Sequence, residues 1–169
     1  MNKSTRQSSE VLDVVTRSHE RVSGVVLPEL YINILIKLNY ALLMDLMGKN
    51  LAPHALSPVS YITMVRLYSN SNNLANPSEL SQFTGETRTN MTRICDDLVS
   101  RGLMHRVASA DDRRRIDLSL TDAGIELLHT VIPALRKKSA VVYSVFSEQE
   151  KELFASLLTK LNHSLEANS

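Results

Sequence analysis

The stretch that most constrains the fold spans residues 84–121, where the spacing of apolar residues changes from a helical to an extended period. Within residues 88–101, four apolar side chains recur every three or four positions, which predicts one buried stripe of a helix: Met91, Ile94, Cys95 and Leu98. From Ile116 to Leu120 apolar and polar residues alternate, which predicts a strand. Gly102 precedes the change of period and suits the left-handed conformation that ends many helices.

A second strand is expected at residues 103–107, so the charged segment 109–115 would form the tip of a hairpin. Ahead of the helix at 88–101, a short helix from Pro77 and a turn at 84–86 have the length of a helix-turn-helix. Helix, turn, helix and basic hairpin follow one another in the order of a winged helix-turn-helix. We therefore expect a mostly helical α+β fold with a DNA-binding lobe.

Polar and cationic side chains occupy the remaining faces of the helix at 88–101. Arginine can donate two hydrogen bonds to a guanine edge, and asparagine can pair with adenine in the same way. Residues 88–115 hold seven arginines and four aspartates, a local excess of +3 in a chain whose net charge is only +1. This pattern predicts that the following residues contact double-stranded DNA: Thr87, Arg88, Thr89, Asn90, Thr92 and Arg93. It does not distinguish contacts with bases from contacts with phosphates. The alternative is a solvated helix face.

Several short motifs carry a resemblance to a known family. They include Arg-Gly-Leu after the predicted recognition helix, Asp-Arg-Arg in the hairpin and Leu-Thr-x-x-Gly at the start of the next helix. Residues 57–132, which contain these motifs, resemble the MarR family of bacterial transcription regulators, and most of all the branch that represses multidrug efflux operons. The resemblance implies a homodimer that represses transcription.

The resemblance also implies roles for the hairpin tip. In the family, one arginine of the Asp-Arg-Arg pattern reaches the minor groove, and an aspartate holds a neighbouring arginine in place. We expect Arg113 to reach the groove and Asp112 to pair with Arg114, with Arg115 beside them. A hairpin tip that serves only solubility is the alternative.

The chain is expected to divide into four segments. These are an N-terminal extension at 1–28, disordered at 1–7 and helical at 9–23, a dimerisation helix and loop at 29–56, the winged helix-turn-helix at 57–121, and C-terminal dimerisation helices at 122–169. The helices at 29–48 and after Ser147 carry more apolar surface than one covered face requires. Ordinary core helices would explain part of this surplus, and a second subunit would explain the rest. The operator of such a dimer should be an imperfect palindrome.

Helix starts are marked by local chemistry. Ser, Thr or Asn side chains can accept hydrogen bonds from the first N–H groups of a helix, and proline suits the first helical position. Such starts are predicted at Ser57-Pro58, Asn76-Pro77, Thr87, Thr121 and Ser147, with Glu79 and Glu150 completing capping boxes. Pro133 should bend its helix or cost it a hydrogen bond.

Small-molecule binding is expected from the resemblance alone, since family members often hold aromatic acids or hydrophobic drugs between the dimer helices and the DNA-binding lobe. The matching positions lie on the helix at 29–48 and on the helix from Pro58: Tyr40, Met44, Met47, Tyr61, Met64 and Arg66. Ordinary core packing is the alternative at each of them, because methionine fills gaps in cores as well as in pockets.

The sequence offers no motif for catalysis or for a bound cofactor. It has no glycine-rich phosphate loop, no Gly-x-Ser-x-Gly elbow and no paired catalytic carboxylates. The histidines are scattered, so no metal is expected. Cys95 is the single cysteine, which suits a reducing cytoplasm, and its place on the apolar stripe favours packing over redox sensing. No apolar run of the roughly 18–20 residues of a membrane span is expected, and charges interrupt the N-terminus where a signal peptide would be apolar.

The prediction is therefore a cytoplasmic, non-enzymatic DNA-binding protein, a homodimeric repressor released by a small aromatic or lipophilic ligand. One alternative keeps DNA binding but has no ligand switch, or activates transcription. Another uses the winged helix for protein interaction only.

Overall fold

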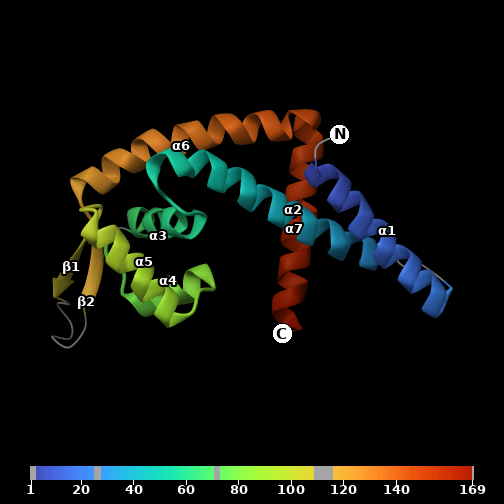
Figure 1. Ribbon diagram of the computed structural model, residues 1–169, viewed down its shortest axis with the longest axis horizontal. Helices are drawn as coiled ribbons and strands as arrows, with labels where there is room; N and C mark the ends of the chain where they lie inside the picture. The colour runs from blue at the N-terminus through green and yellow to red at the C-terminus, as the bar shows by residue number, and fades with distance from the viewer. Residues whose placement is uncertain (1–2, 25–27, 71–72, 109–115, 169) are drawn as a thin grey trace. The chain divides into compact units, whose positions relative to one another are not determined.

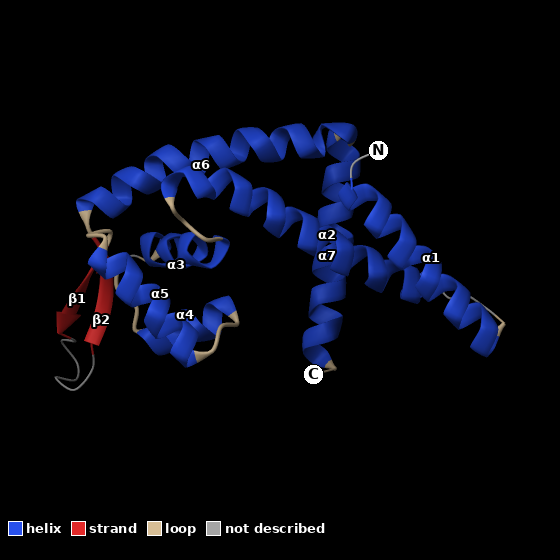
Figure 2. Cartoon of the chain, viewed as in Figure 1, coloured by secondary structure: helices blue, strands red, loops and turns tan. Residues whose placement is uncertain are grey.

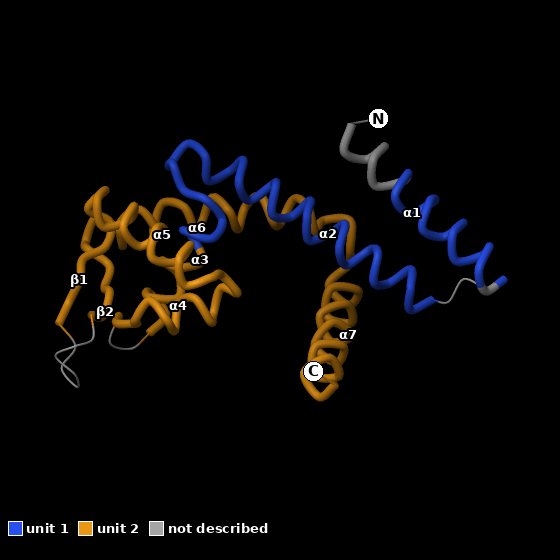
Figure 3. The backbone as a smooth tube through the Cα atoms, turned by 60° about the horizontal axis from the view of Figure 1, so that its bottom comes forward, with its two compact units in different colours: residues 1–61 blue, residues 62–169 orange. Residues whose placement is uncertain are grey.

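The computed structural model describes residues 3–24, 28–70, 73–108 and 116–168. The chain divides into two compact units, Met1–Tyr61 and Ile62–Ser169 (Figure 3). Figure 1 labels the α-helices and the strands. In chain order the elements are α1 (Lys3–Ser23), α2 (Pro28–Leu51), the 3-10 helix η1 (Ala52–His54), α3 (Pro58–Ser69), α4 (Pro77–Thr84), α5 (Arg88–Ser100), β1 (Met104–Ala108), β2 (Ile116–Leu120), α6 (Asp122–Val142), the 3-10 helix η2 (Tyr143–Val145) and α7 (Glu148–Ala167).

Helices dominate the fold, and the described residues form one two-stranded sheet, which confirms the predicted mostly helical α+β class (Figure 2). β1 and β2 pair antiparallel, with Met104 opposite Leu120 and Ala108 opposite Ile116. Ala75, just before α4, bridges to the sheet: its N–H donates to the Leu118 carbonyl at 3.2 Å and its carbonyl accepts from the Leu118 N–H at 2.9 Å. The hairpin is thereby tied to the start of the helix-turn-helix.

The core of the second unit draws on every element from α3 to β2 and on α6. Each of these elements contributes fully buried apolar side chains, among them Met64, Leu67, Leu80, Met91, Leu98, Met104, Leu118, Leu128 and Val131. Burying one such side chain is worth about 1.5–3 kcal/mol. The core therefore holds the helix-turn-helix, the hairpin and the start of α6 together as one lobe.

The predicted helix starts are confirmed. The Asn76 side chain accepts from the N–H groups of Ser78 and Glu79, and Glu79 completes the capping box. Thr87, Thr121 and Ser147 each accept from a backbone N–H in the first turn of α5, α6 and α7. Ser57 Oγ accepts from Ser60 N–H at 3.0 Å at the start of α3. These local bonds set where each helix begins.

A close junction joins the hairpin to α6. Thr121 N–H donates to the Leu103 carbonyl at 3.1 Å, and Thr121 Oγ1 donates to the Gly102 carbonyl at 2.6 Å. At Gly124 a Cβ atom would stand 2.2 Å from the Leu103 carbonyl oxygen. Glycine is therefore required here by space, because any side chain would collide with backbone.

α1, α2 and α7 leave much of their apolar surface exposed. Among the described side chains, α2 buries only Leu51 and α7 buries none. Large apolar side chains that stay more than a third exposed in these helices include Val14, Tyr31, Tyr40, Leu153, Leu157 and Leu165. The surplus apolar surface that the sequence predicts is thus present on the single chain.

Three expectations about the helices need correction. The helix α1 begins at Lys3, within the stretch 1–7 expected to be disordered, and α2 runs on to Leu51 instead of ending near Gly48. The segment Pro28–His54 is long and apolar enough to cross a membrane by length and composition, a test that core helices of soluble proteins also pass. The expectation that no apolar run reaches that length was therefore wrong. The helix α6 continues through Pro133, which has no N–H to donate.

Candidate nucleic-acid interface

The turn between α4 and α5 is held by two hydrogen bonds between Ser81 and Glu86. Gly85 ends α4 in the left-handed conformation, with φ of 72°. Ser81 is buried, and its Oγ donates to the Glu86 carbonyl at 2.6 Å. The Glu86 N–H in turn donates to the Ser81 carbonyl at 3.1 Å. The N-terminus of α5 is thereby set relative to α4.

The helix α5 separates a buried from an exposed side, as its sequence pattern predicts. Met91, Ile94, Cys95 and Leu98 form the buried stripe. The predicted DNA-contacting side chains lie outside that stripe: Thr87, Arg88, Thr89, Thr92 and Arg93 are exposed and Asn90 is half-buried. One short helix therefore brings these six candidates together on its accessible surface.

Two of the candidates are hydrogen-bonded to each other, and one of these two is also bonded to Glu86. Arg93 Nη2 donates to Asn90 Oδ1 at 3.0 Å, and Asn90 Nδ2 donates to Glu86 Oε2 at 2.6 Å. Arg88 is exposed and has no hydrogen bond or ion pair from its guanidinium to any residue that the structure describes. The two arginines of this helix thus differ: one is oriented by neighbours, and the other extends into solvent.

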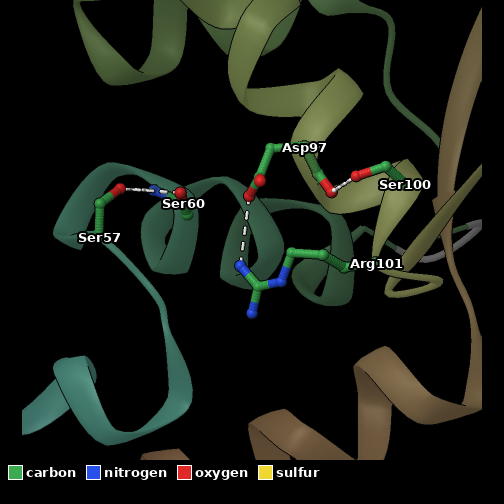
Figure 4. A network of polar contacts seen from close by, with 5 residues as sticks. All are labelled: Ser57, Ser60, Asp97, Ser100 and Arg101. Atoms are coloured by element: carbon green, nitrogen blue, oxygen red, sulfur yellow. Dashed lines mark hydrogen bonds and ion pairs between the residues drawn. The ribbon is translucent and has the colours of Figure 1, made fainter.

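Two ion pairs flank the exposed side of α5. Asp96 pairs with Arg106 of β1, which links α5 to the hairpin. Asp97 pairs with Arg101 at 3.2 Å, and the Asp97 carbonyl accepts from Ser100 Oγ (Figure 4). Both pairs are at least partly exposed, so each contributes little to stability. Their effect is to fix side-chain geometry beside the candidate DNA surface.

Sequence reasoning did not single out Glu86 or Arg106. Glu86 stands four residues before Asn90, a spacing at which side chains on a helix meet, so that contact had a detectable signal. Arg106 and Asp96 are ten residues apart on different elements. Their pairing depends on how β1 returns past α5, which local spacing does not reveal.

The predicted tip of the wing, with Asp112, Arg113, Arg114 and Arg115, lies outside the described residues. The roles expected for these four residues therefore remain predictions. The strands that lead into and out of the tip end at Ala108 and begin at Ile116.

The predicted ligand-contacting positions differ in exposure. Tyr40 on α2 is 64% exposed, whereas Met64 on α3 is fully buried. Met44, Met47 and Tyr61 are half-buried, and burial raises the pKa of the Tyr61 phenol. Arg66 donates to Asn70 Oδ1 at 2.5 Å and stacks its guanidinium over the Phe83 ring at 5.1 Å. Met64 thus behaves as a core residue of the lobe.

Cys95 belongs to the core of α5. Burial raises the pKa of its thiol to about 11, with Asp96 adding to the rise and Arg106 opposing it. The thiolate, which is the form that oxidants and electrophiles attack, is thereby disfavoured at neutral pH. In the described part of the chain, no group of three or more His, Cys, Asp or Glu side chains could hold a metal ion.

Solved structures share this architecture. The chain is similar to a crystal structure of a MepR–DNA complex from S. aureus, with a TM-score of 0.70 at 20% identity over 78% of this chain and 96% of that one. It is also similar to wild-type MarR of E. coli in its apo form, with a TM-score of 0.69 at 18% identity over 81% and 98%. The fold therefore defines a winged helix-turn-helix protein.

The sequence comparisons narrow this class to a family. The model of the MarR family matches residues 56–116. The chain is 34% identical over 119 residues to the transcriptional repressor MprA of Escherichia coli K12, covering 70% of this chain and 68% of that protein. It is 30% identical over 117 residues to the regulator PrsX of Escherichia coli, covering 69% and 70%. The chain belongs to the MarR family of transcriptional regulators, which confirms the resemblance noted in its motifs.

Proposed function

We propose that this regulator is a cytoplasmic homodimer that represses transcription at a palindromic operator and releases DNA when a small aromatic or lipophilic ligand binds. The observation that carries the proposal is the exposed polar side of α5, which presents arginine and asparagine opposite a fully buried stripe. The name of the relative MprA, a transcriptional repressor, supports the sign of control. The MepR–DNA complex supports duplex DNA as the partner.

Contacts with DNA are assigned to two elements. The major groove receives the N-cap of α5 and the first accessible residues of that helix: Thr87, Arg88, Thr89, Asn90, Thr92 and Arg93. Arg113 at the tip of the wing reaches the minor groove, where Asp112, Arg114 and Arg115 support it. Phosphate contacts strengthen binding to every sequence, whereas base contacts select one.

A second copy of the chain is proposed to cover the exposed apolar side chains of α7 and of the N-terminal helices. Exposed apolar patches larger than a few hundred Å² are rare on monomeric soluble proteins. A two-fold pair presents two copies of α5 to successive major grooves, roughly 34–36 Å apart. This spacing makes an imperfect palindrome the expected operator.

The DNA-binding part of the proposal is tested by selecting duplexes from a randomised library and measuring affinity by fluorescence anisotropy at several salt concentrations. Arg88→Ala should weaken binding and, if Arg88 binds a phosphate, should also reduce the salt slope by about 1. Lys160→Ala, which removes one exposed cation from α7, is the matched control and should leave affinity unchanged. Failure to bind any duplex at low salt would favour the protein-interaction alternative.

The ligand part is tested by titrating the selected protein–DNA complex with a panel of aromatic acids and lipophilic drugs. A ligand that binds the free protein more tightly than the DNA-bound form must release DNA. Substitution of Tyr40 or Arg66 by Ala should then shift the release curve to higher ligand concentration. If no compound releases DNA, the regulator is non-inducible or activating.

A further inference from the structure

Asn90 is engaged at both ends of its side-chain amide. Its oxygen accepts from Arg93 Nη2 at 3.0 Å and its nitrogen donates to Glu86 Oε2 at 2.6 Å. The two neighbours determine the orientation of the amide, because a guanidinium can only donate and a carboxylate can only accept. A bidentate contact between Asn90 and adenine would use the same oxygen and nitrogen. The oxygen can still accept and the nitrogen can still donate one further hydrogen bond. Both atoms, however, belong to a half-buried side chain whose orientation the two neighbours already determine, whereas Arg93 is exposed.

The carboxylate that holds Asn90 starts from a fixed backbone. The Glu86 N–H and carbonyl are both hydrogen-bonded to Ser81, at 3.1 and 2.6 Å, and Ser81 is buried beneath the turn. Glu86 also directly precedes Thr87, the N-cap of α5. The series Ser81, Glu86, Asn90 and Arg93 is thus anchored in the lobe at one end and exposed at the other.

We propose that Glu86 and Asn90 are positioning residues which orient the Arg93 guanidinium for contact with a base, and that Asn90 does not itself read the sequence. The inference rests on the proposed function, since it assigns roles within the DNA-binding surface of α5. It reassigns Asn90, whose residue type alone suggested an adenine contact, and adds Glu86.

The physical gain is preorganisation. An arginine side chain has many rotamers, and ordering one at an interface reduces affinity by about two- to tenfold. Because Asn90 restrains Arg93 in the free protein, part of that ordering precedes DNA binding. Arg88, which has no such partner among the described residues, retains its freedom and suits a phosphate contact that tolerates several geometries.

The test is a double-mutant cycle on full-length protein. Its readout is the ratio of affinities for the best duplex selected from a randomised library and for a scrambled duplex of the same composition. Arg93→Ala should lower this ratio by about five- to 150-fold, the range expected when one base contact is removed. Asn90→Ala and Glu86→Ala should each lower it by about two- to tenfold. In the Arg93→Ala background neither should lower it further.

Glu86→Gln is the matched control, because glutamine keeps an oxygen that can accept from Asn90. It should leave the ratio close to that of the unaltered protein, although loss of the negative charge strengthens binding to both duplexes. Thermal unfolding of each variant checks that the lobe stays folded, since all three side chains lie outside the core.

The outcomes separate the inference from the proposed function. If Asn90→Ala lowers the ratio equally with and without Arg93, then Asn90 reads a base directly and the inference is overturned while the DNA-binding function stands. An unchanged affinity ratio in Arg93→Ala also overturns the inference while the DNA-binding function stands. A ratio for Glu86→Gln as low as that for Glu86→Ala rejects the role of Glu86. If the unaltered protein binds no duplex, both the proposed function and the inference fail.

Discussion

Cys95 illustrates how placement within the fold determines the chemistry of a single residue. It lies on the buried stripe of α5, and its exposed fraction is 2%. Desolvation, the largest cause, raises its pKa to about 11. A cysteine in a DNA-binding helix could have suggested redox control, but this thiol is both inaccessible and protonated at neutral pH.

Alkylation of native protein by iodoacetamide at pH 8 should therefore be slow and should become fast when denaturant unfolds the lobe. Mass spectrometry of the alkylated fraction over time measures this difference. Dilute peroxide should likewise leave DNA affinity unchanged, as should Cys95→Ser apart from a loss of stability. Rapid alkylation of native protein would show that α5 opens or that the thiol is activated.

The raised thiol pKa also predicts a pH dependence of stability. The unfolded chain releases the proton near the ordinary value of 9.0, whereas the folded chain retains it to about pH 11. The stabilising contribution is thus complete below pH 9 and is lost as pH rises to about 11. In urea titrations across this range, the free energy of unfolding should fall more for the natural protein than for Cys95→Ala. Parallel curves would contradict the assignment.

At the scale of elements, the junction between the hairpin and α6 depends on a missing side chain. Gly124 lies in the first turn of α6, against the Leu103 carbonyl. Glycine usually destabilises a helix relative to alanine by about 0.5–1 kcal/mol. Glycine is nevertheless required at this position, because the Leu103 carbonyl occupies the space that a Cβ atom would need.

Alanine at Gly124 should therefore destabilise the protein, by about 1–3 kcal/mol, the usual cost of overpacking. Gly48→Ala in α2 is the matched control, because its Cβ would meet only the Pro58 side chain at an ordinary 3.8 Å. That variant should gain about 0.5–1 kcal/mol. Chemical denaturation of both variants measures the two changes in the free energy of unfolding, which should have opposite signs. A Gly124→Ala protein as stable as the unaltered one, or more so, would show that the junction relaxes.

At the scale of the whole molecule, the exposed apolar side chains of α7 are the strongest support for the proposed homodimer. Leu153, Leu157 and Leu165 are each more than half exposed, and no described side chain of α7 is buried. α7 also begins with a complete capping box at Ser147 and Glu150. A helix with so well-defined a start and so little cover within its own chain is suited to pack against a second copy.

In the proposed homodimer, Leu157→Asp should shift the protein from dimer to monomer and weaken operator binding, because a monomer would occupy one half-site only. Sedimentation velocity measures the first effect and anisotropy the second. Thr159→Asp adds the same charge to a different side of α7 and should leave the dimer intact. A Leu157→Asp protein that remains dimeric would place the subunit contact elsewhere.

Much of this protein was predictable from sequence because its signals are local. The caps at Asn76, Thr87, Thr121 and Ser147 act within one helical turn, and the stripe from Met91 to Leu98 follows from helical spacing alone. The switch to an extended period after Gly102 likewise required no knowledge of distant residues. The order of elements and the exposed side of α5 were accordingly determined by the sequence.

Only the tertiary structure decided the contacts between segments that are remote in the chain. Arg106 meets Asp96, Gly124 meets the Leu103 carbonyl, and Ala75 bridges to Leu118, in each case because the hairpin folds back on the helices. Such contacts depend on the packing of several elements at once. The helical start at Lys3 also escaped prediction, because a polar stretch without apolar spacing gives no local signal for a helix.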